Sequence, residues 1–92
     1  MEWDEFEWDD DKADANLRRH GIDFPTATRV FDDPFLIVDE DDSEDYGEER
    51  LIATGVVDGL TVVVVFTERG NRTRIISARK ATQHEQRHYD RG

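Results

Sequence analysis

The chain has 92 residues and a formal net charge of −11, and 36% of its residues are hydrophobic. This length supports one modest core, so residues 1–92 are interpreted as a single domain. Cysteine is absent, which excludes disulfides, cysteine-based zinc sites and thiol catalysis. No segment approaches the ~20 apolar residues of a membrane span, and Met1 leads into acidic residues rather than a signal peptide. We therefore expect a soluble cytoplasmic protein without a membrane partner.

The charge is distributed unevenly along the chain. Residues 1–49 carry 19 acidic and 4 basic side chains, whereas residues 50–92 carry 4 acidic and 8 basic ones. Eight of the acids fall in an acidic loop predicted over residues 39–49. Many acids beside only 2 lysines are typical of proteins that work in high salt, although a loop that only solubilises the domain is the alternative. The negative net charge argues against nucleic acid, but the cationic second half is compatible with it.

The first residues predict a short edge strand followed by a helix. Alternation between Trp3 and Trp8 favours the strand near residues 6–8. In the helix that follows, Asp9 or Asp10 can cap the start and Gly21 can supply the left-handed residue at the end. The expected inward stripe, at helical spacing, is formed by Ala13, Leu17 and His20.

A second, shorter helix is predicted after Asp23, which can cap it, with Pro25 in its first turn. Its apolar side is expected to be formed by Phe24, Ala27 and Phe31. The helix should end at Asp32-Asp33-Pro34. A strand over residues 35–38 then leads into the acidic loop.

The second half predicts a meander of strands and a last helix. Strands are expected over residues 50–57, 60–67 and 72–79, and Asp58-Gly59 is a preferred two-residue hairpin turn. The second of these strands is apolar at nearly every position, as in a central strand covered on both faces. Thr82 and Glu85 form a capping box for a helix that ends near residue 89 or 91. The order β-α-α-β-β-β-β-α predicts an α+β fold with a mostly antiparallel sheet.

Arginine dominates the groups that could carry chemistry. His84 and His88 are four residues apart, but they lack a third ligand at suggestive spacing, so we expect no metal and no other cofactor. Guanidinium groups suit phosphate because they donate two parallel hydrogen bonds, although pairing with surface acids is the alternative role. Strand alternation predicts that Arg74 and Arg79 point to opposite faces. The basic residues near strand ends are Arg50, Arg69, Arg72, Arg74, Arg79 and Lys80.

On the first predicted helix, Lys12, Asn16 and His20 lie at i, i+4 and i+8 and form a polar ridge. His20 also stands in the last turn, where an imidazolium interacts favourably with the helix dipole. A purely structural role for His20 is therefore an alternative to a chemical one.

Three stretches cover nearly the whole chain outside the acidic loop: WDDDKADANLRRHGIDFPTATRVFDDP at 8–34, EERLIATG at 48–55 and VVVVFTERGNRTRIISARKATQHEQRHY at 62–89. Together they resemble the BrnT toxin family, whose members are small ribonucleases of type II toxin–antitoxin pairs. The resemblance implies a RelE-like fold, an RNA substrate and a cognate ribbon-helix-helix antitoxin that forms a heteromeric complex with the toxin. The complex is then expected to bind operator DNA.

The resemblance also implies a reaction, in which a ribose 2′-OH attacks its own 3′-phosphate without a metal ion. His20 or Glu49 would transfer protons. Lys12 could either transfer protons or hold the phosphate oxygens. Charge on the phosphate would be stabilised by three arginines, as in an oxyanion hole. These are Arg50, Arg69 and Arg79. Two alternatives remain: a catalytically silent RNA-binding domain on the same fold, and a protein-interaction module that docks through its acidic loop.

Overall fold

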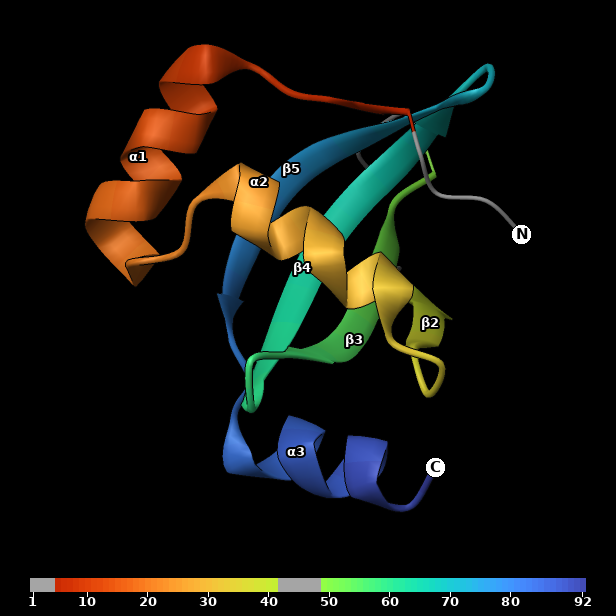
Figure 1. Ribbon diagram of the computed structural model, residues 1–92. Helices are drawn as coiled ribbons and strands as arrows, with labels where there is room; N and C mark the ends of the chain where they lie inside the picture. The colour runs from red at the N-terminus through yellow and green to blue at the C-terminus, as the bar shows by residue number, and fades with distance from the viewer. Residues whose placement is uncertain (1–4, 42–48) are drawn as a thin grey trace.

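The computed structural model describes residues 5–41 and 49–92, which form a five-stranded sheet with α1, α2 and η1 on one face (Figure 1). The strand order is β1-β5-β4-β3-β2, with β1 parallel to β5 and the other neighbours antiparallel. The predicted α+β fold and element order are confirmed. No described helix is long and apolar enough to cross a membrane. The elements are β1 (Phe6–Glu7), α1 (Asp10–His20), α2 (Phe24–Ala27), the 3-10 helix η1 (Thr28–Asp32), β2 (Ile37–Glu40), β3 (Leu51–Val57), β4 (Leu60–Arg69), β5 (Arg72–Lys80) and α3 (Gln83–Asp90).

Helix α1 begins and ends where the sequence predicts. The Asp9 carboxylate accepts hydrogen bonds from the backbone N–H groups of Asp11 and Lys12, which have no partner inside the helix. At the other end, Gly21 adopts φ 72° and donates its N–H to the carbonyl of Leu17. Both ends of α1 are therefore fixed by local chemistry.

The inward face of α1 differs from the predicted one. Asn16 is the buried residue of the helix, whereas Leu17 is 47% exposed and His20 is exposed. Asn16 Nδ2 donates to the carbonyl of Ala78 at 2.8 Å, and Asn16 Oδ1 accepts from the Ala78 N–H at 3.1 Å. Ala13 packs against the core as predicted. The prediction was wrong for Leu17 and His20, because α1 lies against the edge of β5, where backbone groups need a donor and an acceptor that leucine lacks.

The core lies between the sheet and the segment formed by α2 and η1. Asp23 caps α2 as predicted, with its carboxylate 2.6 Å from the Thr26 nitrogen. The ring of Phe31 packs edge-on against Phe66 with a centroid distance of 5.2 Å. Where η1 crosses β3, a Cβ on Gly55 would lie 3.0 Å from the carbonyl oxygen of Val30, so only glycine fits without a shift.

Strand β2 begins two residues later than predicted. The Asp33 carboxylate accepts a hydrogen bond from the Phe35 N–H at 2.8 Å, which holds a turn and leaves Phe35 74% exposed. Asp39 and Glu40, predicted to start the acidic loop, pair with β3 instead. The prediction for the rest of the loop concerns mainly residues 42–48, which lie outside the described residues, as does Trp3.

Strand β4 is the central strand of the sheet, as predicted, and extends two residues beyond the predicted end. The hairpin before it turns at Asp58 and Gly59, with φ values of 51° and 82°. Two consecutive positive φ angles match the right-handed twist of the flanking strands, which explains the preference for Asp-Gly.

A β-bulge in β5 changes which arginines share a face. Val65 pairs with Ser77 and the next residue, Phe66, pairs with Ile75, so Ile76 is an extra residue in β5. Ile75 and Ala78 are therefore both in the core despite their odd separation. Consequently Arg74 and Arg79 share the face opposite α1, α2 and η1, which we call the open face. The predicted placement on opposite faces was wrong because alternation does not anticipate a bulge.

Helix α3 lies apart from the other helices, at the end of the sheet that holds the β3–β4 turn (Figure 1). Its predicted capping box is present, with reciprocal bonds between Thr82 and Glu85. The Tyr89 hydroxyl donates to Asp33 Oδ2 at 2.5 Å, and His88 Nε2 lies 3.5 Å from Asp39 Oδ2. Helix α3 therefore runs from the end of β5 to the β2 side of the sheet.

Candidate functional site

A hollow of about 210 Å³ lies between α1 and the edge of β5, and we call it the α1–β5 groove. Three basic side chains from one face of α1 line it, namely Lys12, Arg19 and His20. Across from them, β5 contributes Ile76 and Ser77. Because α1 is capped at both ends and joined to β5 through Asn16, these side chains project from a fixed helix.

The α1–β5 groove concentrates positive charge in an otherwise acidic protein. Among residues 5–41 and 49–92, the side chains of Lys12, Arg19 and His20 make neither an ion pair nor a hydrogen bond. They remain exposed and available to an anion. The ammonium of Lys12 and the guanidinium of Arg19 are cationic donors, which form short, charge-assisted hydrogen bonds with phosphate oxygens.

Arg79 stands on the open face two residues after Ser77, a separation of about 7 Å along the strand. Its guanidinium donates to both carboxylate oxygens of Glu85, at 2.6 and 2.8 Å. The hydrogen bonds from Arg79 lower the pKa of Glu85 to about 2, while those to Glu85 raise the pKa of Arg79. A guanidinium has five N–H donors, so this pair orients Arg79 and leaves donors for a further acceptor.

The remaining predicted residues lie toward the other end of the sheet. In the β4–β5 register Arg69 lies opposite Arg72, beside the turn. Arg79 lies opposite Val63, which is six residues or about 20 Å from Arg69 along β4. Arg50 and Glu49 immediately precede β3 near the same end, and the Glu49 carbonyl accepts a hydrogen bond from Thr67. The structure therefore brings Lys12 and His20 to one groove and places Arg79 two residues beyond its Ser77, on the open face. It does not bring Glu49, Arg50 or Arg69 to the groove.

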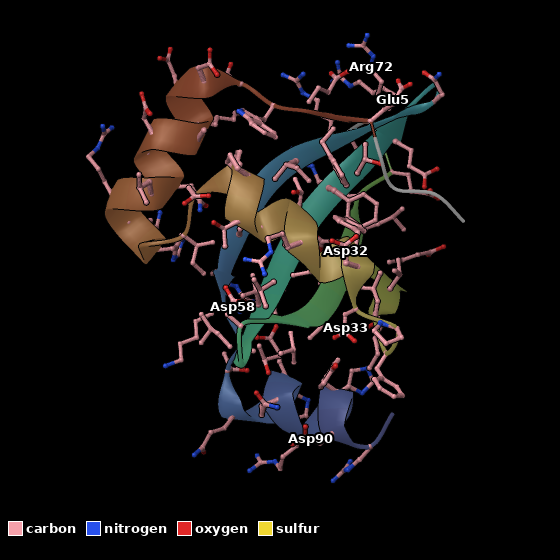
Figure 2. All side chains as sticks on the ribbon, in the orientation of Figure 1. Glu5, Asp32, Asp33, Asp58, Arg72 and Asp90 are labelled. Atoms are coloured by element: carbon pink, nitrogen blue, oxygen red, sulfur yellow. The ribbon has the colours of Figure 1, made fainter. Side chains whose placement is uncertain are left out.

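Glu7 on β1 and Glu5 just before it pair with two further arginines at that distant end. Arg74 Nη1 lies 2.8 Å from Glu7 Oε2, and Arg72 lies within 4.0 Å of both Glu5 and Glu7. Figure 2 shows Glu5 beside Arg72 at the opposite end of the molecule from Asp90 on α3. Arg72 and Arg74 are thus engaged with acids, which is the alternative role that the sequence suggested for surface arginines.

A second hollow, of about 300 Å³, lies between α3 and the open face of β3, and we call it the α3–β3 hollow. It is close to Arg79, because Glu85 lines it. No three His, Asp or Glu side chains in the described part of the chain are close enough to hold one metal ion. The lining residues are Asp39, Ile52, Thr54, His84, Glu85 and His88.

The largest of the hollows considered, about 400 Å³, has the wrong charge for phosphate. It lies beside Phe35 and is lined by Asp32, Asp33 and Asp58. Its one arginine, Arg29, is paired with both carboxylate oxygens of Asp58 at 2.9 Å. Charge therefore favours the smaller α1–β5 groove as the anion site.

Comparison with known families finds a match over most of the chain. The sequence model of the BrnT family, described as the ribonuclease toxin of type II toxin–antitoxin systems, matches residues 8–85. The chain belongs to the BrnT family. The match includes the α1–β5 groove and the pair formed by Arg79 and Glu85. BrnT membership implies an RNA substrate and an antitoxin partner. A comparison with individually curated proteins gives no match.

Sequence reasoning missed two residues of this candidate site. Arg19 lies seven residues after Lys12, hence on the same helical face, and that spacing was sufficient to find it. Glu85 was recognised only as a capping residue, because the capping box accounts for its presence without Arg79. Its pairing with Arg79 depends on the turn between β5 and α3, which the sequence pattern does not define.

Proposed function

We propose that this BrnT protein cleaves RNA at the α1–β5 groove without a metal ion. The observation that supports this proposal is the grouping of Lys12, Arg19 and His20 around one hollow, with Arg79 on the adjoining open face. Phosphate binding needs positive charge, and proton transfer near neutral pH needs a group such as imidazole. The groove combines both within a protein whose net charge is −11.

The proposed reaction is an internal transfer of the phosphoryl group. The 2′-oxygen of a ribose forms a bond to the phosphorus on its own 3′-oxygen, and the bond from phosphorus to the 5′-oxygen of the next nucleotide breaks. A base removes the 2′-hydroxyl proton, and an acid protonates the departing 5′-oxygen. The products are a 2′,3′-cyclic phosphate and a 5′-hydroxyl, so the reaction consumes no water in this step.

His20 is the residue proposed to transfer protons, because it lines the groove while Glu49 lies toward the distant end of the sheet. Lys12 and Arg19 would hold the non-bridging phosphate oxygens. Arg79, oriented by Glu85, would stabilise the charge that develops as the 2′-oxygen attacks. Arg50 and Arg69 would contact RNA farther along the strand or the antitoxin.

The proposed partner is a ribbon-helix-helix antitoxin, two toxins binding one antitoxin dimer. Acidic antitoxin side chains would cover the cationic face around Arg50, Arg69 and Arg79. The complex rather than the toxin would bind operator DNA, because a net charge of −11 opposes binding to phosphate. Modification of arginines in the isolated toxin and in a complex recovered from the native host tests this: reactivity should fall in the complex.

Incubation of the purified protein with total cellular RNA, with and without EDTA, tests the proposed activity. Cleavage should persist in EDTA and should be lost in Lys12→Ala and His20→Ala. Arg18→Ala is the matched control, since Arg18 is an exposed base on α1 outside the groove. RNA binding without cleavage would instead indicate a silent RNA-binding domain, and absence of binding would indicate a protein-interaction module.

A further inference from the structure

We infer that the α3–β3 hollow is a nucleobase subsite that selects bases with an exocyclic amino group, and hence cytosine over uracil. This inference rests on the proposed function, because it requires an RNA strand that crosses the open face. It adds a determinant of sequence preference that the cationic groove alone does not provide, because phosphate contacts carry no sequence information.

The hollow lies next to Arg79 on the open face. Thr54, Val63 and Arg79 form one cross-strand row over β3, β4 and β5, so Thr54 and Arg79 are about 10 Å apart. Glu85 connects the two places, because it lines the hollow and accepts both hydrogen bonds from Arg79. A phosphate on Arg79 would therefore have a neighbouring base within reach of the hollow.

The lining suits a flat heterocycle. Ile52 supplies a half-buried apolar surface, and the exposed His84 and His88 supply rings on which a base can stack. Thr54 is only 4% exposed, yet its hydroxyl makes no hydrogen bond among the described residues. Its oxygen is reached by solvent in the hollow, so the polar edge of a ligand can hydrogen-bond to it there.

Asp39 supplies the discrimination between bases. Its side chain is 54% exposed and its Oδ2 lies 3.5 Å from His88, while its Oδ1 has no hydrogen bond within the described residues. Cytosine carries an amino donor at position 4 that a carboxylate accepts. Uracil carries an oxygen there, which would face the carboxylate without a proton between them. The amino-bearing base is therefore favoured.

Other uses of the hollow fit less well. His84, His88 and Asp39 suggest a metal site, but no three such side chains in the described part of the protein are close enough to share one ion. Glu85 is already occupied by Arg79 and by the Thr82 N–H. A ligand that offers hydrogen-bond donors to Asp39 and a flat surface to the imidazoles matches the lining better.

Cleavage and binding of oligocytidylate and oligouridylate of equal length test the inference. The parent should cleave the cytosine strand with a kcat/KM about tenfold higher. Asp39→Asn should abolish that preference, because an amide can satisfy either base. Glu40→Gln is the matched control: this neighbouring acid pairs with Leu51 and points to the opposite face, so its preference should equal that of the parent.

Binding to strands with 2′-deoxy sugars separates the subsite from catalysis. A binding preference for cytosine that disappears in Asp39→Asn supports the subsite. If the ribo-strands also remain uncut, the proposed cleavage is overturned and the subsite stands. Cleavage of both strands with equal kcat/KM, or an unchanged preference in Asp39→Asn, overturns the subsite and leaves the proposed activity standing. A parent that neither binds nor cleaves either strand overturns both.

Discussion

Asn16 and Ala78 are joined by two hydrogen bonds, so a helix side chain pairs with β5 as the backbone of a neighbouring strand would. Nδ2 of Asn16 also donates to the carbonyl of Ile22 at 3.0 Å, which links the start of the α2 segment to the same point. The amide thus determines how α1 lies against β5. The α1–β5 groove depends on that contact, because one of its walls is α1 and the other is β5.

Replacement of Asn16 by alanine should lower the free energy of unfolding by about 2–4 kcal/mol. The substitution leaves the N–H and carbonyl of Ala78 and the carbonyl of Ile22 without partners in a buried place. Denaturant unfolding monitored by circular dichroism measures the loss. Leu17→Ala, one residue along and 47% exposed, serves as the control and should cost less than 1 kcal/mol. Equal losses in both variants would contradict this role of Asn16.

The pair formed by Arg79 and Glu85 should stabilise the protein most above pH 4.5. The pKa of Glu85 falls from 4.5 to about 2 on folding, so its contribution is present above 4.5 and is lost as the pH falls toward 2. With Arg79 39% exposed, solvent screening limits the pair to about 1–2 kcal/mol.

A double-mutant cycle with Arg79→Gln and Glu85→Gln measures this coupling. The coupling energy should be largest near neutral pH and should decrease between pH 4.5 and 2. A carboxyl NMR titration of Glu85 provides an independent value. Titration of Glu85 near 4.5 would contradict the ion pair and would remove the proposed orientation of Arg79.

Tyr89→Phe should remove the hydrogen bond between α3 and Asp33 without altering the core. Desolvation raises the pKa of Asp33, but hydrogen bonds from Tyr89, Phe35 and Val56 outweigh it, and the pKa is lowered overall. The same bond raises the pKa of Tyr89 from 10.0 to about 12. Loss of the hydroxyl should cost about 1 kcal/mol near neutral pH.

The difference in stability between parent and Tyr89→Phe should also depend on alkaline pH. Because folding raises the pKa of Tyr89, the parent has its full advantage below pH 10.0 and loses it as the pH approaches 12. Unfolding free energies of both proteins across this range measure the change. A constant difference across this range would show that the hydroxyl does not bond to an ionised Asp33.

The sequence predicted the elements that depend on local chemistry. The caps Asp9, Asp23 and Thr82 and the turn at Asp58-Gly59 act through neighbours in the chain, and all four are confirmed. The errors arise where distant segments meet. Asn16 is buried because β5 lies beside it, and the extra residue Ile76 changes the face of every residue before it in β5. Periodicity describes one element at a time and misses both effects.

In the candidate site, too, the sequence predicted what lies on one element and not which distant segments meet. Lys12 and His20 share a helix face, so sequence spacing was enough to group them, and the structure adds Arg19. Arg69 and Arg79 are ten residues apart in sequence, but a hairpin turn separates them, so they lie near opposite ends of neighbouring strands. The order of basic residues in the chain therefore did not determine which of them meet.

The products formed from a single short RNA in EDTA test the account most directly. The purified protein should release a fragment ending in a 2′,3′-cyclic phosphate and a fragment beginning with a 5′-hydroxyl, identified by mass spectrometry. The same RNA with one 2′-deoxy sugar at the cut position should stay intact there, and Lys12→Ala and His20→Ala should leave both strands uncut. Cleavage that requires a divalent ion, continues at the deoxy position, or persists undiminished in both variants would contradict the proposed chemistry at the α1–β5 groove.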